Sequence, residues 1–211
     1  GVMLHKLKKF EEAEICFNKT IQLNPKFADV YNNLGSLLMD LGRFEEAEIN
    51  CKKAIKFNPN NADALNTLGN IFKERNKLED AENCFTKAIK FKPDHADAHY
   101  NYGVMLYSKK NYKKAIEHFK LTDAGMSKSF LLNALYQLHE KDNFYSHLDH
   151  LLSQDYNDAL IGSLISRSEI RYKVNRPNPF CNDPLNYILT TDLLKNSEFQ
   201  DNYLNNAIKI L

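Results

Sequence analysis

Two histidines flank an aspartate in the segment His147-Leu148-Asp149-His150, the best candidate in the sequence for metal-dependent chemistry. His-x-Asp is the first half of the two-histidine, one-carboxylate site that binds catalytic iron. That site needs a second, distant histidine, and none follows His150. On an amphipathic helix, His147 and His150 are instead surface or half-buried neighbours, and this is the interpretation we adopt.

Other reactive groups show no catalytic spacing either. None of the four cysteines lies in a close C-x-x-C pair of the kind that binds zinc. Cys16, Cys51 and Cys84 fall in apolar stripes, where a small buried thiol is the usual state. The sequence has no Gly-rich phosphate loop, nucleophile elbow or metalloprotease His-Glu pair. It therefore predicts no catalytic residue, no metal site and no cofactor, and a chain that is not itself an enzyme.

Three of the four cysteines, Cys16, Cys51 and Cys84, lie in a regular repeat. The same residue types return 34 residues apart at three kinds of position, namely Gly35, Gly69 and Gly103; Ala47, Ala81 and Ala115; and Pro25, Pro59 and Pro93. Self-similarity at a fixed period of this length indicates a solenoid, in which each unit buries its apolar face only against its neighbours.

Each unit has the apolar spacing of two amphipathic helices, with a turn between them and a proline after them. Gly42 stands where the first helix should end in a left-handed residue, and Asn76 and Lys110 hold the same place in the next units. Small residues such as Gly35 and Ala47 should let the two helices approach closely, so a bulky residue there would overpack the interface.

These residues resemble the pattern of the tetratricopeptide repeat, W-x2-L-G-x2-Y, then A-x3-F, then P. The matching residues are Tyr31-x2-Leu34-Gly35-x2-Leu38, Ala47-x3-Cys51 and Pro59; Leu65-x2-Leu68-Gly69-x2-Phe72, Ala81-x3-Phe85 and Pro93; and His99-x2-Tyr102-Gly103-x2-Leu106 and Ala115-x3-Phe119. The leading part supplies Ala13-x3-Phe17 and Pro25. The resemblance implies an all-α fold, a right-handed α-solenoid of helix-turn-helix repeats with a divergent helical C-terminal cap.

Three segments follow from this pattern. Residues 1–122 form the repeat array, with a truncated first repeat at 1–27 and repeats at 28–61, 62–95 and 96–122. Residues 123–176 keep helical spacing without the consensus, as expected of a cap with a polar outer face. Residues 177–211 begin with a Pro-rich strap that contains Cys181 and end in another helical pattern.

The resemblance also implies that the first helix of each unit lines a concave groove. An amide side chain there can donate to and accept from a peptide backbone, which holds an extended strand without reading its side chains. An asparagine-lined groove is similar to the repeat domain of the O-linked N-acetylglucosamine transferase. We therefore predict a protein or an extended peptide segment as the partner, held by Asp29, Asn32, Asn33, Ser36, Asp63, Asn66, Asn70, Lys73, Asp97, Tyr100, Asn101 and Tyr107.

An alternative function comes from the segment 178–188. It resembles the linker in bacterial proteins where such repeats precede a 2-oxoglutarate/iron(II) oxygenase domain. That likeness implies a substrate-recognition arm of a multidomain enzyme, namely such an oxygenase, a glycosyltransferase or a sulfotransferase, whose catalytic domain lies outside this chain.

Composition limits the classes of partner and the cellular location that we expect for the chain. Lys and Arg number 28 against 27 Asp and Glu, so no wide basic face for nucleic acid is indicated. No run of about 18 apolar residues exists, so we expect no membrane span and a cytoplasmic chain. The truncated first repeat leaves Leu4 and Leu7 without neighbours in this sequence, which predicts self-association through that end.

Overall fold

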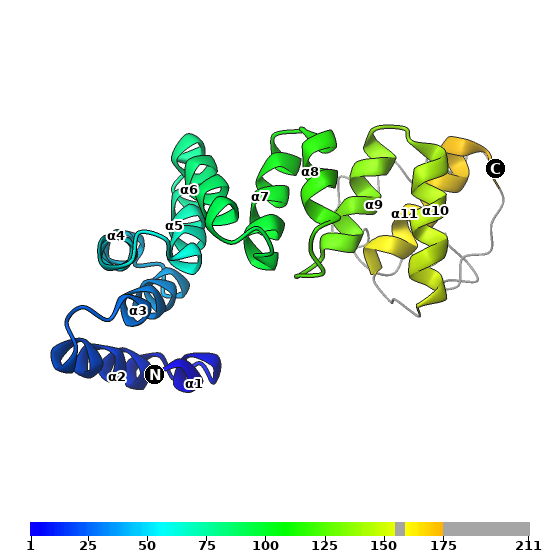
Figure 1. Ribbon diagram of the computed structural model, residues 1–211. Coiled ribbons are helices and arrows are strands. Elements are labelled where there is room, and N and C mark those ends of the chain that lie inside the picture. Colours follow the sequence, from blue (N-terminus) through cyan, green and yellow to red (C-terminus); the bar gives the residue numbers. More distant parts are fainter. Residues whose placement is uncertain (155–158, 175–211) are drawn as a thin grey trace, which may run out of the picture. The chain divides into compact units, whose positions relative to one another are not determined.

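The computed structural model describes residues 1–154 and 159–174. Every regular element within these ranges is an α-helix, so the all-α prediction is confirmed (Figure 1). The chain divides into two compact units, of which the first is Gly1–Leu131 and the second begins at Leu132. The predicted Pro-rich strap and Cys181 lie outside the described residues.

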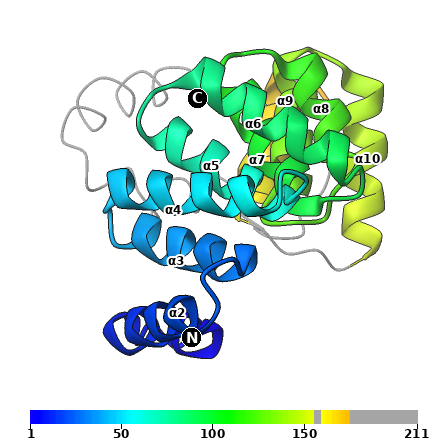
Figure 2. The ribbon, with the colours of Figure 1, turned by 60° about the vertical axis from the view of Figure 1, so that its left-hand side comes forward.

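The first unit is a stack of helix pairs. Each first helix packs on its own second helix and on the second helix of the preceding pair, while α3, α5 and α7 also contact one another in turn. Figure 2 shows α2, α3 and α4 as successive layers. The pairs are α1 (Val2–Lys6) with α2 (Phe10–Leu23), α3 (Ala28–Asp40) with α4 (Phe44–Phe57), α5 (Ala62–Glu74) with α6 (Leu78–Phe91), and α7 (Ala96–Ser108) with α8 (Tyr112–Phe119).

The turns inside the pairs have the predicted left-handed residue. Gly42, Asn76 and Lys110 have φ values of 72°, 58° and 59°, and Lys8 joins them at 59°. The next backbone N–H then reaches back to the helix, as in Arg43 N to Leu38 O at 2.8 Å. This is the hydrogen bond of a Schellman cap, which satisfies a carbonyl at the helix end. The bond offsets part of the strain of about 1–2 kcal/mol that Lys8 and Lys110 carry in this region.

Cys51 departs from the repeat consensus but packs against its glycine as closely as the consensus phenylalanine does in the next pair. A Cβ atom at Gly69 would lie 2.6 Å from Phe85 Cε1, while one at Gly35 would lie 2.5 Å from Cys51 Sγ. Cys51 is fully buried and takes the place that Phe85 takes in the next repeat. It is therefore a core residue, as predicted.

The second unit contains most of α9 (Ser127–Gln137), α10 (Lys141–Ser153) and α11 (Ala159–Tyr172). Its core is apolar, with Leu132, Phe144 and Leu164 fully or almost fully buried. The guanidinium of Arg171 lies 3.7 Å from the ring centre of Tyr136 and donates to that residue's carbonyl at 2.6 Å. This cation–π contact and hydrogen bond fasten α11 to α9.

Candidate functional site

The predicted groove residues share one face of each first helix. In α3, Asp29, Asn32 or Asn33, and Ser36 follow spacings of three and four, which places them on one side of the helix. The opposite side carries the buried residues Tyr31, Leu34 and Leu38. The same division recurs in α5 and α7 because the sequence repeats.

A cavity of about 580 Å³ lies where these faces meet in the first unit. It brings together most of the predicted residues, namely Asn32, Asn33, Ser36, Asp63, Asn66, Asn70, Asp97, Tyr100 and Asn101. A second cavity, of about 320 Å³, shares Met39, Asn70 and Asn101 with the first and contains Lys73. The two cavities therefore form one continuous groove, which is the name used below.

Two predicted residues lie outside both cavities. Asp29 is exposed at the start of α3, and its Oδ1 accepts a hydrogen bond from Asn61 Nδ2 at 3.0 Å. The ring of Tyr107 packs edge-on against Tyr112 and Phe130, with ring centres 5.2 and 5.3 Å apart. Tyr107 is half-buried, and this burial raises the pKa of its phenol.

Several groove residues were not among the predicted ones, and Thr67, His95 and Gly125 of the larger cavity are examples. Thr67 follows Asn66 on α5, and its hydroxyl donates to the Asp63 carbonyl of its own helix at 3.0 Å. His95 precedes α7 at the position that Asn61 occupies before α5, so the repeat register could have identified it. Gly125 has φ of 54° and lies so close to the Tyr100 ring that a Cβ there would be 2.7 Å away. No sequence signal indicated that approach.

Amide groups line the floor of the groove and connect two repeats. Asn101 Nδ2 of α7 donates to Asn66 Oδ1 of α5 at 3.0 Å. The Oδ1 atoms of Asn32 and Asn70 are buried without any hydrogen-bond partner. An unsatisfied buried acceptor costs about 1–3 kcal/mol, and rotation of the amide about its last torsion can turn the oxygen toward a ligand.

Carboxylates occupy equivalent positions in three successive repeats, with Asp63 and Asp97 in the groove and Asp29 outside it. Each is in the first turn of its helix, where the positive end of the helix dipole favours it. The residue preceding the next first helix reaches back to two of them, so that Asn61 bonds to Asp29 and His95 Nε2 lies 3.0 Å from Asp63 Oδ1. The side-chain carboxylate of Asp97 makes no hydrogen bond or ion pair with residues 1–154 and 159–174.

The histidines and cysteines that the sequence offered as reactive groups include ones that are hydrogen-bonded within a helix or buried in the core. His147 Nδ1 lies 2.9 Å from the Asn143 carbonyl, one turn back on α10. Burial raises the pKa of the Cys51 thiol to about 12 and that of Cys84 to about 11, which leaves both poorly nucleophilic. The described part of the chain holds no group of three or more metal-ligating side chains. It also holds no helix with the length and hydrophobicity to cross a membrane.

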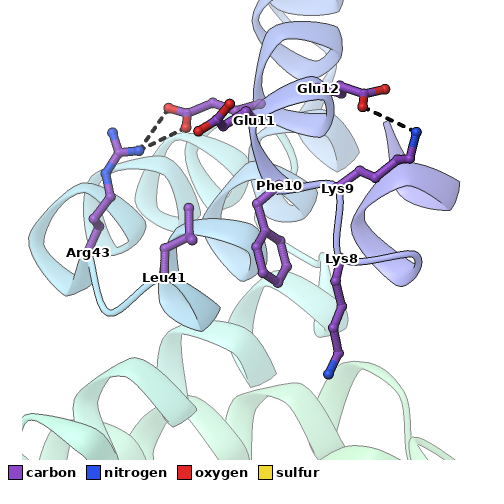
Figure 3. Close-up of a pocket in the computed structure, with 8 residues that line it drawn as sticks. Lys8, Lys9, Phe10, Glu11, Glu12, Leu41 and Arg43 are labelled. Atoms are coloured by element: carbon purple, nitrogen blue, oxygen red, sulfur yellow. Dashed lines mark hydrogen bonds and ion pairs between the residues drawn. The ribbon is translucent and has the colours of Figure 1, made fainter.

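A separate cavity of about 490 Å³ lies between the α1–α2 turn and the α3–α4 turn. In Figure 3, Phe10 and Leu41 are seen between two ion pairs, one made by Arg43 and the other by Lys9 with Glu12. Arg43 Nη1 lies 2.8 Å from Glu14 Oε2, and the hydrogen bonds to Glu46 and Glu14 raise the pKa of Arg43. Because most of its charged side chains are paired with each other, this cavity is the weaker candidate for a ligand site.

Comparison with known proteins agrees with this geometry. Matches to the tetratricopeptide repeat family cover residues 1–27, 28–61 and 66–127. The chain belongs to the tetratricopeptide repeat family. Repeats of this family serve in general as non-catalytic scaffolds for protein interaction, so the chain is an interaction module. No curated protein matches it in sequence.

Solved structures of tetratricopeptide repeat proteins share the fold. YrrB, described as having an unusual peptide-binding site, is 23% identical with a TM-score of 0.65, over 92% of this chain and 98% of its own. MamA is 20% identical with a TM-score of 0.59, over 82% and 96%. PilF of Pseudomonas aeruginosa is 18% identical with a TM-score of 0.59, over 72% and 71%. Identities this low support the solenoid fold alone.

Proposed function

We propose that this chain binds an extended segment of a partner protein in the groove lined by α3, α5 and α7. The observation that carries the proposal is the row of amides across the three helices, in which Asn101 bonds to Asn66 while Asn32 and Asn70 have unpaired oxygens. A peptide backbone offers one N–H donor and one C=O acceptor at each residue, and an amide side chain can satisfy both.

The size and lining of the groove suit a backbone better than a compact ligand. The larger cavity alone, about 580 Å³, is within the range of ligand sites, and it continues into the second cavity. Its lining is mostly polar, whereas pockets for small molecules are predominantly apolar. An extended chain crossing the three helices can use the amides in succession.

Peptide binding tests the proposal directly. Purified protein is titrated into unrelated fluorescent peptides of about ten residues, and anisotropy is recorded. The double variant Asn66→Ala and Asn70→Ala should weaken binding by about fivefold to about 150-fold, since each of two backbone hydrogen bonds contributes about 0.5–1.5 kcal/mol. The matched control, Asn18→Ala with Asn83→Ala, removes exposed amides from α2 and α6, outside both cavities, and should bind normally.

Circular dichroism on each variant checks that the helices remain folded. Unchanged affinity in a folded Asn66→Ala, Asn70→Ala variant would place the binding surface elsewhere on the chain. Tyr100 is a poor choice for this test because its ring packs against Phe119 and Phe130 and lies beside Gly125, so its removal would disturb the core.

A further inference from the structure

Asp63 and Asp97 in the groove, together with Asp29 beside it, form a row of carboxylates that no lysine or arginine neutralises. Asp29 is bonded to the neutral amide of Asn61, and Asp63 faces the imidazole of His95, which is charged only when protonated. Asp97 has no partner in the described residues. The Asp63 side chain is 66% exposed, so its carboxylate is available to a ligand.

The rest of the lining adds to this negative character. Lys73 is the one lysine among the residues that line the two cavities, and its Nζ lies 3.5 Å from Glu74 Oε1. Asp40 contributes another carboxylate to the smaller cavity, where His5 Nε2 lies 2.8 Å from its Oδ2. The groove therefore presents an excess of acceptors, which the unpaired oxygens of Asn32 and Asn70 increase.

Acceptors and negative charge together fit one kind of side chain. The lysine ammonium has three N–H donors and the arginine guanidinium five, and neither group accepts a hydrogen bond. An acidic segment would instead bring like charges into the groove, which disfavours binding.

The repeat also sets the spacing of the charges. Asp29, Asp63 and Asp97 occur once per repeat, on first helices that contact one another. Packed helices are about 8–10 Å apart. Three residues of a polyproline II segment advance about 9 Å and return to the same side of the chain. Cationic side chains three residues apart can therefore each reach one aspartate.

Resting on the proposed function, we propose that the groove selects an extended partner segment with lysine or arginine at about every third residue, paired with Asp63 and Asp97 in the groove and with Asp29 beside its α3 end. This selection depends on the side chains of the partner. The hydrogen bonds from the groove amides to a peptide backbone, in contrast, form with any sequence. The selection makes the partner a basic segment of another protein.

Four fluorescent peptides of about ten residues test this selection. Three are identical except that every third residue is lysine, glutamine or glutamate, and the fourth has the lysines of the first placed side by side. The spaced lysine peptide should bind about tenfold more tightly than the glutamine peptide, since an exposed ion pair gives roughly a two- to threefold gain and three such pairs are made. Glutamate and adjacent lysines should both bind more weakly than spaced lysines.

Two double variants assign the effect to the groove. Asp63→Asn with Asp97→Asn should reduce the lysine preference, measured as the ratio of the affinities of that variant for the lysine and glutamine peptides, to about twofold. Glu79→Gln with Asp80→Asn changes the net charge equally, in the first turn of α6 and outside both cavities, and should keep the preference. Added salt should reduce the preference of the wild-type chain.

Failure of this inference and failure of the proposed function give different results. Binding of all the peptides with equal affinity, or a lysine preference that survives in the Asp63→Asn, Asp97→Asn variant, overturns the basic specificity alone. Equal affinity for spaced and adjacent lysines overturns the register of one charge per repeat. Absence of binding by every peptide overturns peptide binding in the groove and this inference with it.

Discussion

Substitution of Gly69 by alanine should destabilise the chain through a single close contact. The added Cβ would lie 2.6 Å from Cε1, 2.8 Å from Cδ1 and 3.0 Å from Cζ of Phe85. That ring is fully buried and has no route to solvent. Overpacking costs about 1–3 kcal/mol, while alanine gains about 1 kcal/mol over glycine in a helix. We expect a net loss of about 1 kcal/mol in the free energy of unfolding.

A double-mutant cycle separates the contact from helix propensity. Phe85→Leu removes the outer ring atoms, so in that background Gly69→Ala should retain only its helix gain and stabilise by about 1 kcal/mol. The coupling energy is then about 2 kcal/mol, within the range for residues in contact. Urea unfolding followed by circular dichroism gives the free energy of unfolding of the wild type, the two single variants and the double variant. These four values are compared if the dependence of the free energy on urea concentration has the same slope in each protein.

The sign of the effect decides the outcome. If Gly69→Ala lowers stability equally with Phe85 and with leucine at that position, the close contact is not the cause. A stabilising effect in the wild-type background would show that α5 and α6 separate at little cost.

Three further changes test other parts of the chain. Burial and His99, whose Nδ1 lies 2.9 Å from His118 Nδ1, hold the pKa of His118 below its usual value, so the unfolded chain binds this proton more readily than the folded chain. The contribution of His118 to stability should therefore be complete above about pH 6.5 and should be lost as the pH drops. His118→Gln should make the urea midpoint of unfolding less dependent on pH in this range. Arg75→Ala breaks ion pairs to the preceding repeat and should lower the free energy of unfolding by up to about 1 kcal/mol in low salt and by less in about 0.5 M NaCl. The control is Lys56, an exposed lysine without an ion pair in the described residues, and Lys56→Ala should change stability by less than about 0.5 kcal/mol in the same unfolding assay. Leu7 is 65% exposed, so we expect the sedimentation coefficient to rise with protein concentration and Leu7→Glu to abolish the rise; a wild-type monomer at all concentrations would contradict self-association through this end.

Local interactions made much of the fold predictable. The left-handed turns at Gly42, Asn76 and Lys110 depend on a few adjacent residues, and they recur every 34 residues, so the repeat predicts their positions. The face of each first helix follows from spacings of three and four, so the residues that line the groove on α3 and α5 could be selected in advance. Tyr107 was placed in the groove by the same rule, but the structure packs it with Phe130.

Sequence alone determined the family, the helix pairs and which residues face away from the core, because these depend on short-range periodicity and a fixed repeat. Tertiary structure alone decided which charges in the groove are paired. Asn61 reaches Asp29 and His95 faces Asp63 from the start of the next first helix, while the Asp97 carboxylate has no such partner among the described residues. Each contact joins residues 32 positions apart in the chain, and it depends on how successive helices twist and on side-chain rotamers, which residue types do not encode.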